Sequence, residues 1–377
     1  MDTEDYTPDA LLQEGLRRLA DLLGPTWNVS LRPVHEGARG VDALVELKPE
    51  GDGTFTQLLV ELKRSVTPRM IEEVLLPRVD LLRQVNHYTN LLVMAPWLSL
   101  KTQQMLRQHD ISYLDLTGNV SLRVTRPAIV IYTEGATRAP RAMTSGQSRT
   151  TLAGPKAGRL VRLLAEVRPP YRAGELAQAS GLSLAYVSRL LDTLGDQLLI
   201  RRDGRTITDV DWPNLLRARA EQAVLLKSNT YTGMLAPNGV ESVLMRLRTL
   251  PPSEFDGVAV TGSYAAHDVA PLSAGGQLML YVAPRLAVDD LSDDLGLLRV
   301  QENADVLLLR PPDDVVFEGT RDVMGIQHVA LSQLALDCLS GPGRMPAEGE
   351  AVLEYMSRDE GQWRGFAISD LRRRPRF

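Results

Sequence analysis

The stretch from 155 to 210 constrains the fold most, because its apolar spacing and its breaks fix the order of several short elements. It opens with a helical repeat of leucines that ends at a double proline, 169–170. A short helix is expected at 173–180, followed by a tight turn that begins at Gly181. A third helix is expected at 184–194. Three short helices with a tight turn before the last one predict a helix-turn-helix arrangement.

A basic hairpin follows the third helix. Two short strands are expected at 198–200 and 206–208, and the turn between them carries an Asp-Gly pair that favours a tight hairpin. Arginines flank this turn on both sides. Helices followed by a basic hairpin are the order of a winged helix-turn-helix, which binds DNA. We therefore predict a winged helix-turn-helix DNA-binding domain at 155–229.

The third helix and the wing supply the residues expected to contact DNA. The helix is expected to bury Leu184, Val187, Leu190, Leu191 and Leu194. Hydroxyl-bearing residues near its start can then approach base edges, and its arginine can contact guanine or phosphate. Arginines of the wing can straddle phosphates or enter a minor groove. The predicted DNA-binding residues are Ser183, Tyr186, Ser188, Arg189, Arg201, Arg202 and Arg205. The alternative is a small helical packing domain with a solvated hairpin, or a module for protein contacts.

Charge is distributed unevenly along the chain. The 377 residues include 42 Lys and Arg and 47 Asp and Glu, a net charge of −5. That balance alone argues against a general nucleic-acid binder. Residues 135–230, however, carry 15 basic and 8 acidic side chains, a net of +7, which leaves −12 for the rest. A basic middle between acidic ends favours a local DNA-binding module. Residues 135–154, rich in Ser, Thr, Gly, Ala and Arg, are predicted to be a basic linker.

The regions on either side of this middle are predicted to mix helices and strands. The order before the linker is helix, hairpin, helix, strand, helix, strand, which predicts an α/β domain at 1–134. Helical and strand-like runs also alternate after the winged helix, which predicts a C-terminal α/β domain at 230–377. The predicted fold class is therefore multidomain α/β and α+β, with the winged helix at the centre.

Three polar residues in the first domain form a candidate metal site. Asp42 begins one expected strand, and Glu61 and Lys63 end the next, on one face of it. Two carboxylates can hold a magnesium ion, and a lysine can stabilise charge on a scissile phosphate. The arrangement resembles the PD-(D/E)xK nuclease fold, and Glu14 of the first helix could join it. The alternative is a Glu–Lys pair at a solvated sheet edge. We expect the nuclease-like fold without cleavage, because folds outlive activities.

Three stretches resemble segments of one protein family. They are Ile111–Val120, with the core Ile-x-Tyr-Leu-Asp-x-x-Gly-Asn-Val, then Val260–Ala266 and Leu334–Arg344. All three are similar to segments of AbiEi-like proteins, the antitoxin-type transcriptional regulators of type IV toxin–antitoxin systems. The resemblance implies a DNA-binding regulator that is often paired with a nucleotidyltransferase toxin. In those antitoxins the winged helix usually lies near the N-terminus, whereas here a nuclease-like domain precedes it.

The remaining features narrow the class of protein. A single cysteine, Cys338, excludes an internal disulfide framework and a multi-cysteine metal site. No apolar run approaches the roughly 18 residues of a membrane span, so a cytoplasmic protein without membrane contact is expected.

The leading hypothesis is a sequence-specific transcriptional regulator. We expect a homodimer on double-stranded operator DNA, with a cognate toxin as a further protein partner and no cofactor. One alternative is a metal-dependent DNA endonuclease that uses Asp42, Glu61 and Lys63 with magnesium. The other is an antitoxin that neutralises a nucleotidyltransferase toxin by protein contact.

Overall fold

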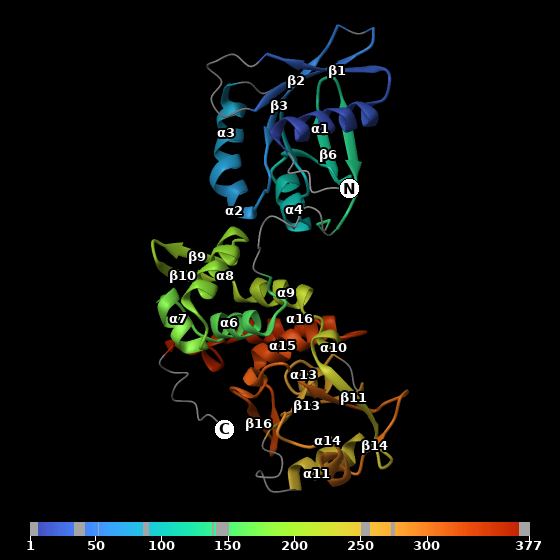
Figure 1. Ribbon diagram of the computed structural model, residues 1–377, viewed down its shortest axis with the longest axis vertical. Helices are drawn as coiled ribbons and strands as arrows, with labels where there is room; N and C mark the ends of the chain where they lie inside the picture. The colour runs from blue at the N-terminus through green and yellow to red at the C-terminus, as the bar shows by residue number, and fades with distance from the viewer. Residues whose placement is uncertain are drawn as a thin grey trace. The chain divides into compact units, whose positions relative to one another are not determined.

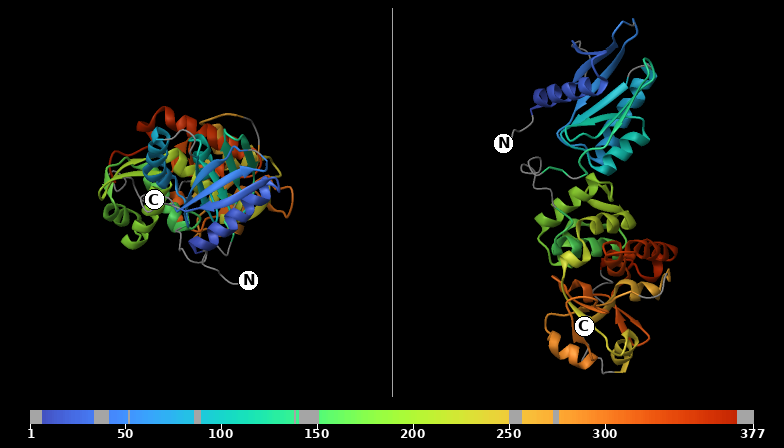
Figure 2. Two further views of the ribbon diagram at one scale, coloured as in Figure 1. Left: turned by 90° about the horizontal axis from the view of Figure 1, so that it is seen from above. Right: turned by 90° about the vertical axis from the view of Figure 1, so that its right-hand side faces the viewer.

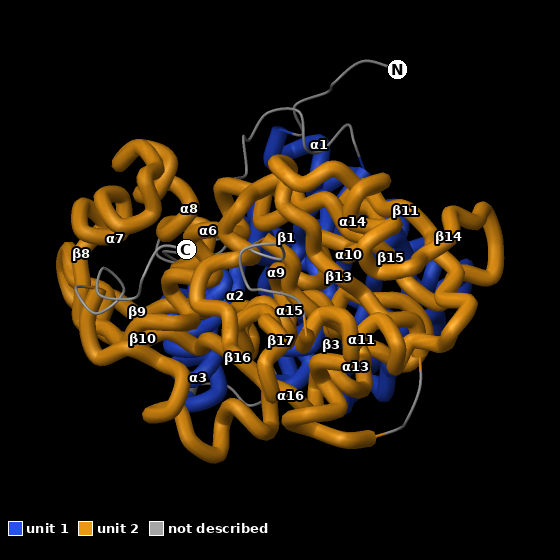
Figure 3. The backbone as a smooth tube through the Cα atoms, turned by 90° about the horizontal axis from the view of Figure 1, so that it is seen from below, with its two compact units in different colours: residues 1–149, 196–198 blue, residues 150–195, 199–377 orange. Residues whose placement is uncertain are grey.

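The structure is a computed structural model of the 377-residue chain. It describes residues 7–33, 42–51, 53–85, 90–137, 139–140, 151–249, 257–272 and 276–368. The chain divides into two compact units, one of residues 1–149 with 196–198 and one of residues 150–195 with 199–377 (Figure 3). Both units mix helices with sheets, which confirms the predicted α/β class.

The first unit is built on one seven-stranded sheet. Its strands follow the order of the chain: β1 (Trp27–Arg32), β2 (Ala43–Pro49), β3 (Thr56–Leu62), β4 (Asn90–Ala95), β5 (Ser112–Asp115), β6 (Val120–Val124) and β7 (Ile129–Thr133). The central strands β3, β4 and β5 are parallel, and the outer neighbours pair antiparallel. Parallel strands with both faces covered are expected to be apolar throughout, and β4 is buried along nearly its whole length.

Helices cover both faces of this sheet. The helices are α1 (Pro8–Leu23), α2 (Pro68–Met70), the π-helical turn η1 (Ile71–Leu75), α3 (Leu76–Val85) and α4 (Leu100–Gln108). Leu19 of α1 packs with Leu92 and Leu114 on one face, whereas Val93 and Tyr113 belong to a second core. That second core includes residues of η1 and α4. Successive side chains of β4 and β5 therefore point alternately into the core under α1 and into the core under η1 and α4. Figure 2 shows α1 in dark blue on one side of the sheet and the cyan helices on the other.

The second unit begins with the predicted winged helix. Its elements are α6 (Pro155–Glu166), β8 (Tyr171–Arg172), α7 (Ala173–Ser180), α8 (Leu184–Asp196), β9 (Ile200–Asp203), β10 (Thr206–Val210), α9 (Trp212–Gln222) and α10 (Leu225–Ser228). The strands form a three-stranded antiparallel sheet in the order β8-β10-β9. In Figure 1, β9 and β10 project as a hairpin beside α8.

A second seven-stranded sheet follows in the order β14-β11-β15-β13-β12-β17-β16. Its strands are β11 (Thr230–Leu235), β12 (Val258–Thr261), β13 (Leu278–Val282), β14 (Leu298–Arg299), β15 (Val306–Arg310), β16 (Arg321–Val323) and β17 (Ile326–His328). Its helices are α11 (Val240–Thr249), α13 (Gly262–His267), α14 (Val288–Leu295), η2 (Asp314–Phe317), α15 (Leu331–Leu339), α16 (Met345–Arg358) and η3 (Glu360–Gln362). Helix α15 is buried from Leu331 through Cys338.

The winged helix and the C-terminal region share one hydrophobic core. That core extends from Leu160 and Val187 of the winged helix to Leu334 of α15. Within this core, Trp212 and Trp363 make an edge-to-face contact with ring centroids 4.8 Å apart. The predicted boundary at 230 thus lies inside a continuous apolar core, and the division into three domains stays a prediction. Among the described residues, no helix has both the length and the hydrophobicity needed to cross a membrane.

Candidate nucleic-acid interface

The turn between α7 and α8 has the local geometry of a helix-turn-helix. Gly181 caps α7 with a left-handed backbone, φ +67°, which favours glycine. The Ser183 hydroxyl then accepts a hydrogen bond from the backbone N–H of Tyr186 at 3.4 Å. Helix α8 begins at Leu184, directly after Ser183. The sequence therefore sets both the end of α7 and the start of α8.

One face of α8 is buried, and the opposite face is open. Val187, Leu190, Leu191 and Leu194 are buried as predicted. The expectation for Leu184 is wrong, because its side chain is 54% exposed. Leu184 is the first residue of α8 and lies one turn before the first core contact of the helix, at Val187. This exposed leucine adds an apolar group next to Ser183, where a thymine methyl group could be contacted.

The polar residues predicted on α8 are not equally accessible. Ser183 and Arg189 are exposed, and Ser188 is half-buried. Tyr186 is also half-buried, because its ring packs against the core of the unit. Burial raises the pKa of the Tyr186 hydroxyl, while Arg219 and Arg189 oppose this rise. The hydroxyl is therefore neutral at physiological pH and keeps its proton for donation.

The wing presents the three predicted arginines at the surface. Arg201, Arg202 and Arg205 are exposed, and Gly204 forms the turn with a left-handed φ of +56°. Arg202 Nη1 donates to Asp192 Oδ1 of α8 at 2.8 Å. This ion pair links the wing to α8.

Arg172 extends the basic surface beyond the residues that sequence reasoning identified. It lies on β8, in register with Thr206 of the wing, and its side chain is exposed. This position was not predicted from the sequence, because a two-residue strand has no period of its own. The signal that could have pointed to it is a basic residue two positions after the double proline.

The nuclease-like residues lie close together in the first unit, but each has a protein partner. Glu61 is 1% exposed, and its Oε1 lies 2.7 Å from Lys63 Nζ and 2.5 Å from Arg78 Nη1. Asp42 Oδ2 accepts the backbone N–H of Leu62 at 2.7 Å. The strand period therefore brings Glu61 and Lys63 together as predicted. The described part of the chain contains no group of three or more His, Cys, Asp or Glu that could hold a metal ion.

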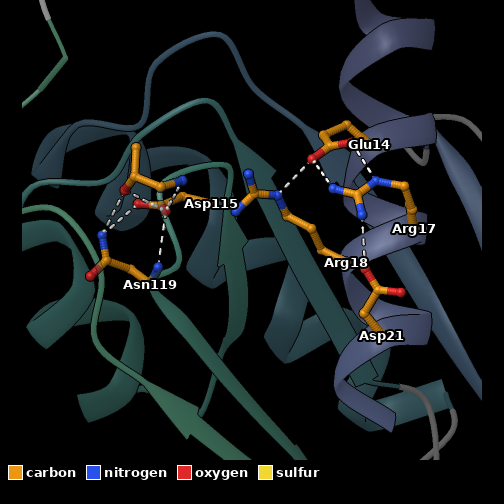
Figure 4. Close-up of polar contacts among 7 residues, drawn as sticks. Glu14, Arg17, Arg18, Asp21, Asp115 and Asn119 are labelled. Atoms are coloured by element: carbon orange, nitrogen blue, oxygen red, sulfur yellow. Dashed lines mark hydrogen bonds and ion pairs between the residues drawn. The ribbon is translucent and has the colours of Figure 1, made fainter. Parts of the chain in front are cut away.

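Glu14, the fourth candidate of that site, also has cationic partners. Its Oε1 accepts from Arg17 Nη2 at 2.7 Å and from Arg18 Nε at 2.8 Å (Figure 4). Hydrogen bonds from Arg17 and Arg18 lower the pKa of Glu14 to about 2. The carboxylate is therefore ionised and neutralised on the surface of α1.

Asp115 organises the first of the three family-like stretches. Its carboxylate is fully buried and accepts the backbone N–H groups of Leu98, Thr117 and Asn119 at 2.8–3.0 Å. The Asn119 amide donates to Asp115 Oδ2 at 2.8 Å (Figure 4). Gly118, with φ +100°, completes the turn between β5 and β6. This stretch is therefore a turn fixed by one carboxylate.

The other two family-like stretches meet in the C-terminal region. The Thr261 hydroxyl donates to Asp337 Oδ2 at 2.6 Å, and the Tyr281 hydroxyl donates to Oδ1 at 3.0 Å. Gln333 also donates to Oδ1, at 2.8 Å. Burial raises the pKa of Asp337 to about 6, against the lowering effect of these donors. Val260–Ala266 and Leu334–Arg344 are thus joined by a buried polar network.

The comparisons with known proteins bear on the winged helix. A model of the IclR helix-turn-helix domain matches residues 156–204. The match runs from α6 to the turn of the wing and includes every predicted DNA-binding residue except Arg205, which follows it directly. No curated protein and no solved structure was found to match the chain. The domain match, together with the exposed basic wing, supports a DNA-binding transcriptional regulator.

Proposed function

We propose that this protein is a sequence-specific transcriptional regulator. Helix α8 recognises the base sequence of operator DNA, and the wing contacts the DNA backbone. The observation that carries the proposal is the combination of an open polar face on α8 with a basic wing tied to that helix through Arg202 and Asp192. A recognition helix specifies sequence in the major groove, and wing arginines supply phosphate or minor-groove contacts.

The contacts divide into two chemical classes. Exposed Ser183 directly before α8, and half-buried Ser188 and exposed Arg189 within it, carry hydroxyl and guanidinium groups that can bond to base edges. Arg201 and Arg205 flank the wing turn, where a phosphate contact fixes position without reading sequence. The half-buried Tyr186 joins the base-reading class through its hydroxyl.

Selection of binding sites from random DNA with the full chain tests this proposal. The expected result is enrichment of one motif, protected in a footprint of the selected fragment. Arg358→Ala is the matched control, since Arg358 is an exposed arginine on α16 that pairs with Glu354 in the same helix. It should enrich the same motif. Failure of the wild-type chain to enrich any motif would contradict the proposal.

An antitoxin role extends this proposal. It rests on the resemblance of Ile111–Val120, Val260–Ala266 and Leu334–Arg344 to AbiEi-like regulators. The buried contact between Thr261 and Asp337 supports treating the last two as parts of one folded region. Co-expression with a nucleotidyltransferase encoded beside the gene tests it: rescue of growth is expected, and unrelieved toxicity would contradict the antitoxin role. Nuclease activity is not part of the proposal, because Glu61 is paired with two cations.

A further inference from the structure

A cavity of about 80 Å³ lies in the second unit, between the helices of the winged helix and the C-terminal region. Its walls include Gly158 of α6, Arg219 of α9 and Ser228 of α10. The C-terminal region contributes Asp313 and Asp337. A water needs roughly 10–15 Å³ of such volume, so the cavity has room for a group of about five heavy atoms.

Arg219 is the unusual side chain of this cavity. Its Nη1 is fully buried and has no hydrogen-bond partner among the residues that the structure describes. Buried guanidinium groups are normally paired, because an unpaired buried charge is costly. Burial lowers the pKa of Arg219 to about 10, so the group is still positively charged at neutral pH. Arg219 is therefore a cation that lacks a counter-charge.

The acidic residues around the cavity already have partners. Both oxygens of Asp313 accept from Arg159 Nη2 at 2.8 Å, and its Oδ1 also accepts the backbone N–H of Val315. Asp337 accepts hydrogen bonds from Thr261, Tyr281 and Gln333. None of these contacts involves Arg219. A small ligand could therefore provide the missing negative charge.

The backbone beside Arg219 makes room for the guanidinium. A Cβ atom at Gly158 would lie 2.9 Å from Arg219 Nη2, which is closer than such atoms pack. Glycine on α6 thus permits the guanidinium to lie against that helix. This close approach holds the charged group at the wall of the cavity.

We propose that this cavity is a binding site for a small oxyanion, a carboxylate or phosphate group, with Arg219 as its anchoring cation. A guanidinium matches such groups because its parallel N–H donors bond to two oxygens at once. Ser228 also lines the cavity, and a serine hydroxyl can donate to such a group. The size of the cavity favours inorganic phosphate or a short carboxylate over a larger metabolite.

The site has a direct route to the helix-turn-helix. Asp313 of the cavity wall accepts from Arg159 Nη2 of α6 at 2.8 Å, and Arg159 Nη1 donates to the backbone oxygen of Ser180, the last residue of α7, at 3.2 Å. An oxyanion bound in the cavity lies beside this pair, so its charge acts on the contact that holds the end of α7 before the turn to α8. This coupling to operator binding rests on the proposed function, whereas binding of the oxyanion does not.

Isothermal titration of the full chain without DNA tests the site itself. The probes are sodium phosphate and sodium acetate, each against sodium chloride at equal ionic strength. We expect saturable binding of at least one oxyanion, with one site per chain. Binding of phosphate alone identifies a phosphate site, and binding of acetate alone identifies a carboxylate site. Absence of binding of both oxyanions would overturn the proposal.

Variants link the binding to the residue. Arg219→Gln should weaken oxyanion binding at least tenfold, and Arg358→Gln should leave it unchanged. Gly158→Ala provides a second variant that keeps the charge but pushes the guanidinium aside, and it should also weaken binding. Circular dichroism verifies that each variant is folded. Unchanged binding in both folded site variants would contradict the role of Arg219.

A second measurement tests the coupling. Operator affinity of the wild-type chain should change at least threefold when the oxyanion saturates the site, and Arg219→Gln should abolish the change. Unchanged wild-type affinity would overturn the coupling and leave the binding site standing. Loss of all sequence-specific DNA binding with intact oxyanion binding would instead refute the proposed function alone.

Discussion

At the scale of single residues, Arg202 belongs to both parts of the DNA-binding surface. Its ion pair with Asp192, at 2.8 Å, fixes the wing beside α8. Asp192 is 67% exposed at its side chain, so the pair contributes only about 0–1 kcal/mol to stability. The pair matters for geometry and charge instead. It positions Arg202, and it places the Asp192 carboxylate on the face that would meet DNA. Sequence spacing could not reveal this pair, because the two residues come from different elements.

The wing arginines should control the salt dependence of DNA binding. Replacing Arg201 and Arg205 with alanine should weaken binding to all sequences, because phosphate contacts do not depend on base identity. The slope of log affinity against log salt should fall by about 0.9 for each lost contact. Fluorescence anisotropy at several salt concentrations measures this slope, with Arg358→Ala as control. An unchanged slope in the double variant would exclude phosphate contacts by Arg201 and Arg205.

The buried carboxyl of Asp337 should make stability depend on pH. Its pKa is raised from 3.8 to about 6 by burial, so between pH 4 and 6 the folded chain holds a proton that the unfolded chain has lost. The free energy of unfolding therefore decreases through this group as pH rises across that window. Buried His328, whose pKa is lowered to about 4, acts in the opposite direction.

The Asp337→Asn variant separates the two effects, because His328 is common to both proteins. The free energy of unfolding of the variant minus that of the wild type should increase from pH 4 to pH 6. Denaturant unfolding at a series of pH values measures the difference. A difference that stays constant across this range would show that Asp337 does not titrate there.

At the scale of elements, α6 connects the DNA-binding part to the C-terminal region. Arg162 is 2% exposed, pairs with Glu166, and donates to the backbone oxygens of Val315 and Glu318. Glu166 in turn accepts from the Ser332 hydroxyl of α15. Both ends of the network are buried, so α6 is held by directed bonds as well as by apolar packing. A change in the C-terminal region can therefore reach the helix-turn-helix.

Breaking this network should destabilise the whole second unit. Arg162→Ala leaves Glu166 buried without its charge partner, which typically costs about 3–5 kcal/mol. Ser332→Ala removes one hydrogen bond, and its cost should be smaller, about 1–3 kcal/mol. Chemical unfolding followed by tryptophan fluorescence reports on the shared core through Trp212 and Trp363. Equal stability of Arg162→Ala and wild type would show that the network does not hold α6.

The sequence predicted regular elements well where their pattern was strong. The order predicted before the linker, helix, hairpin, helix, strand, helix and strand, agrees with α1, the pair β2 and β3, α3, β4, α4 and β5. The edge strands β1 and β7 were missed, because edge strands mix polar and apolar residues and lack a clear period. The unpaired Nη1 of Arg219 could not be predicted from the sequence, because its surroundings form only when separate helices pack together in the folded chain.

At the scale of the whole molecule, the winged helix is one part of a large folded unit. Its core continues into the C-terminal region, so α8 packs on a core larger than the winged helix alone. A single winged helix makes a small interface with DNA, and specific sites usually combine two half-sites. We therefore propose that two copies of the chain bind one operator.

Dimerisation should appear in sedimentation of the full chain. We expect a homodimer and a selected motif that is close to palindromic, with half-sites about one helical turn apart, roughly 10 base pairs. Analytical ultracentrifugation of the free chain and of its complex with the operator fragment measures the stoichiometry. A monomer both free and on DNA would remove this prediction.

The most direct test of the central claim compares specific with non-specific affinity in variants of α8. Arg189→Ala should lower affinity for the selected operator by about 1–3 kcal/mol and leave affinity for scrambled DNA nearly unchanged, because base contacts carry the specificity. The wing variant with Arg201 and Arg205 replaced by alanine should weaken both affinities alike. Titrations of both fragments at one salt concentration give the ratio for each protein. A fall in the ratio confined to the α8 variant is the predicted result. An unchanged ratio in folded Arg189→Ala and Ser188→Ala variants would contradict the claim that α8 reads DNA sequence.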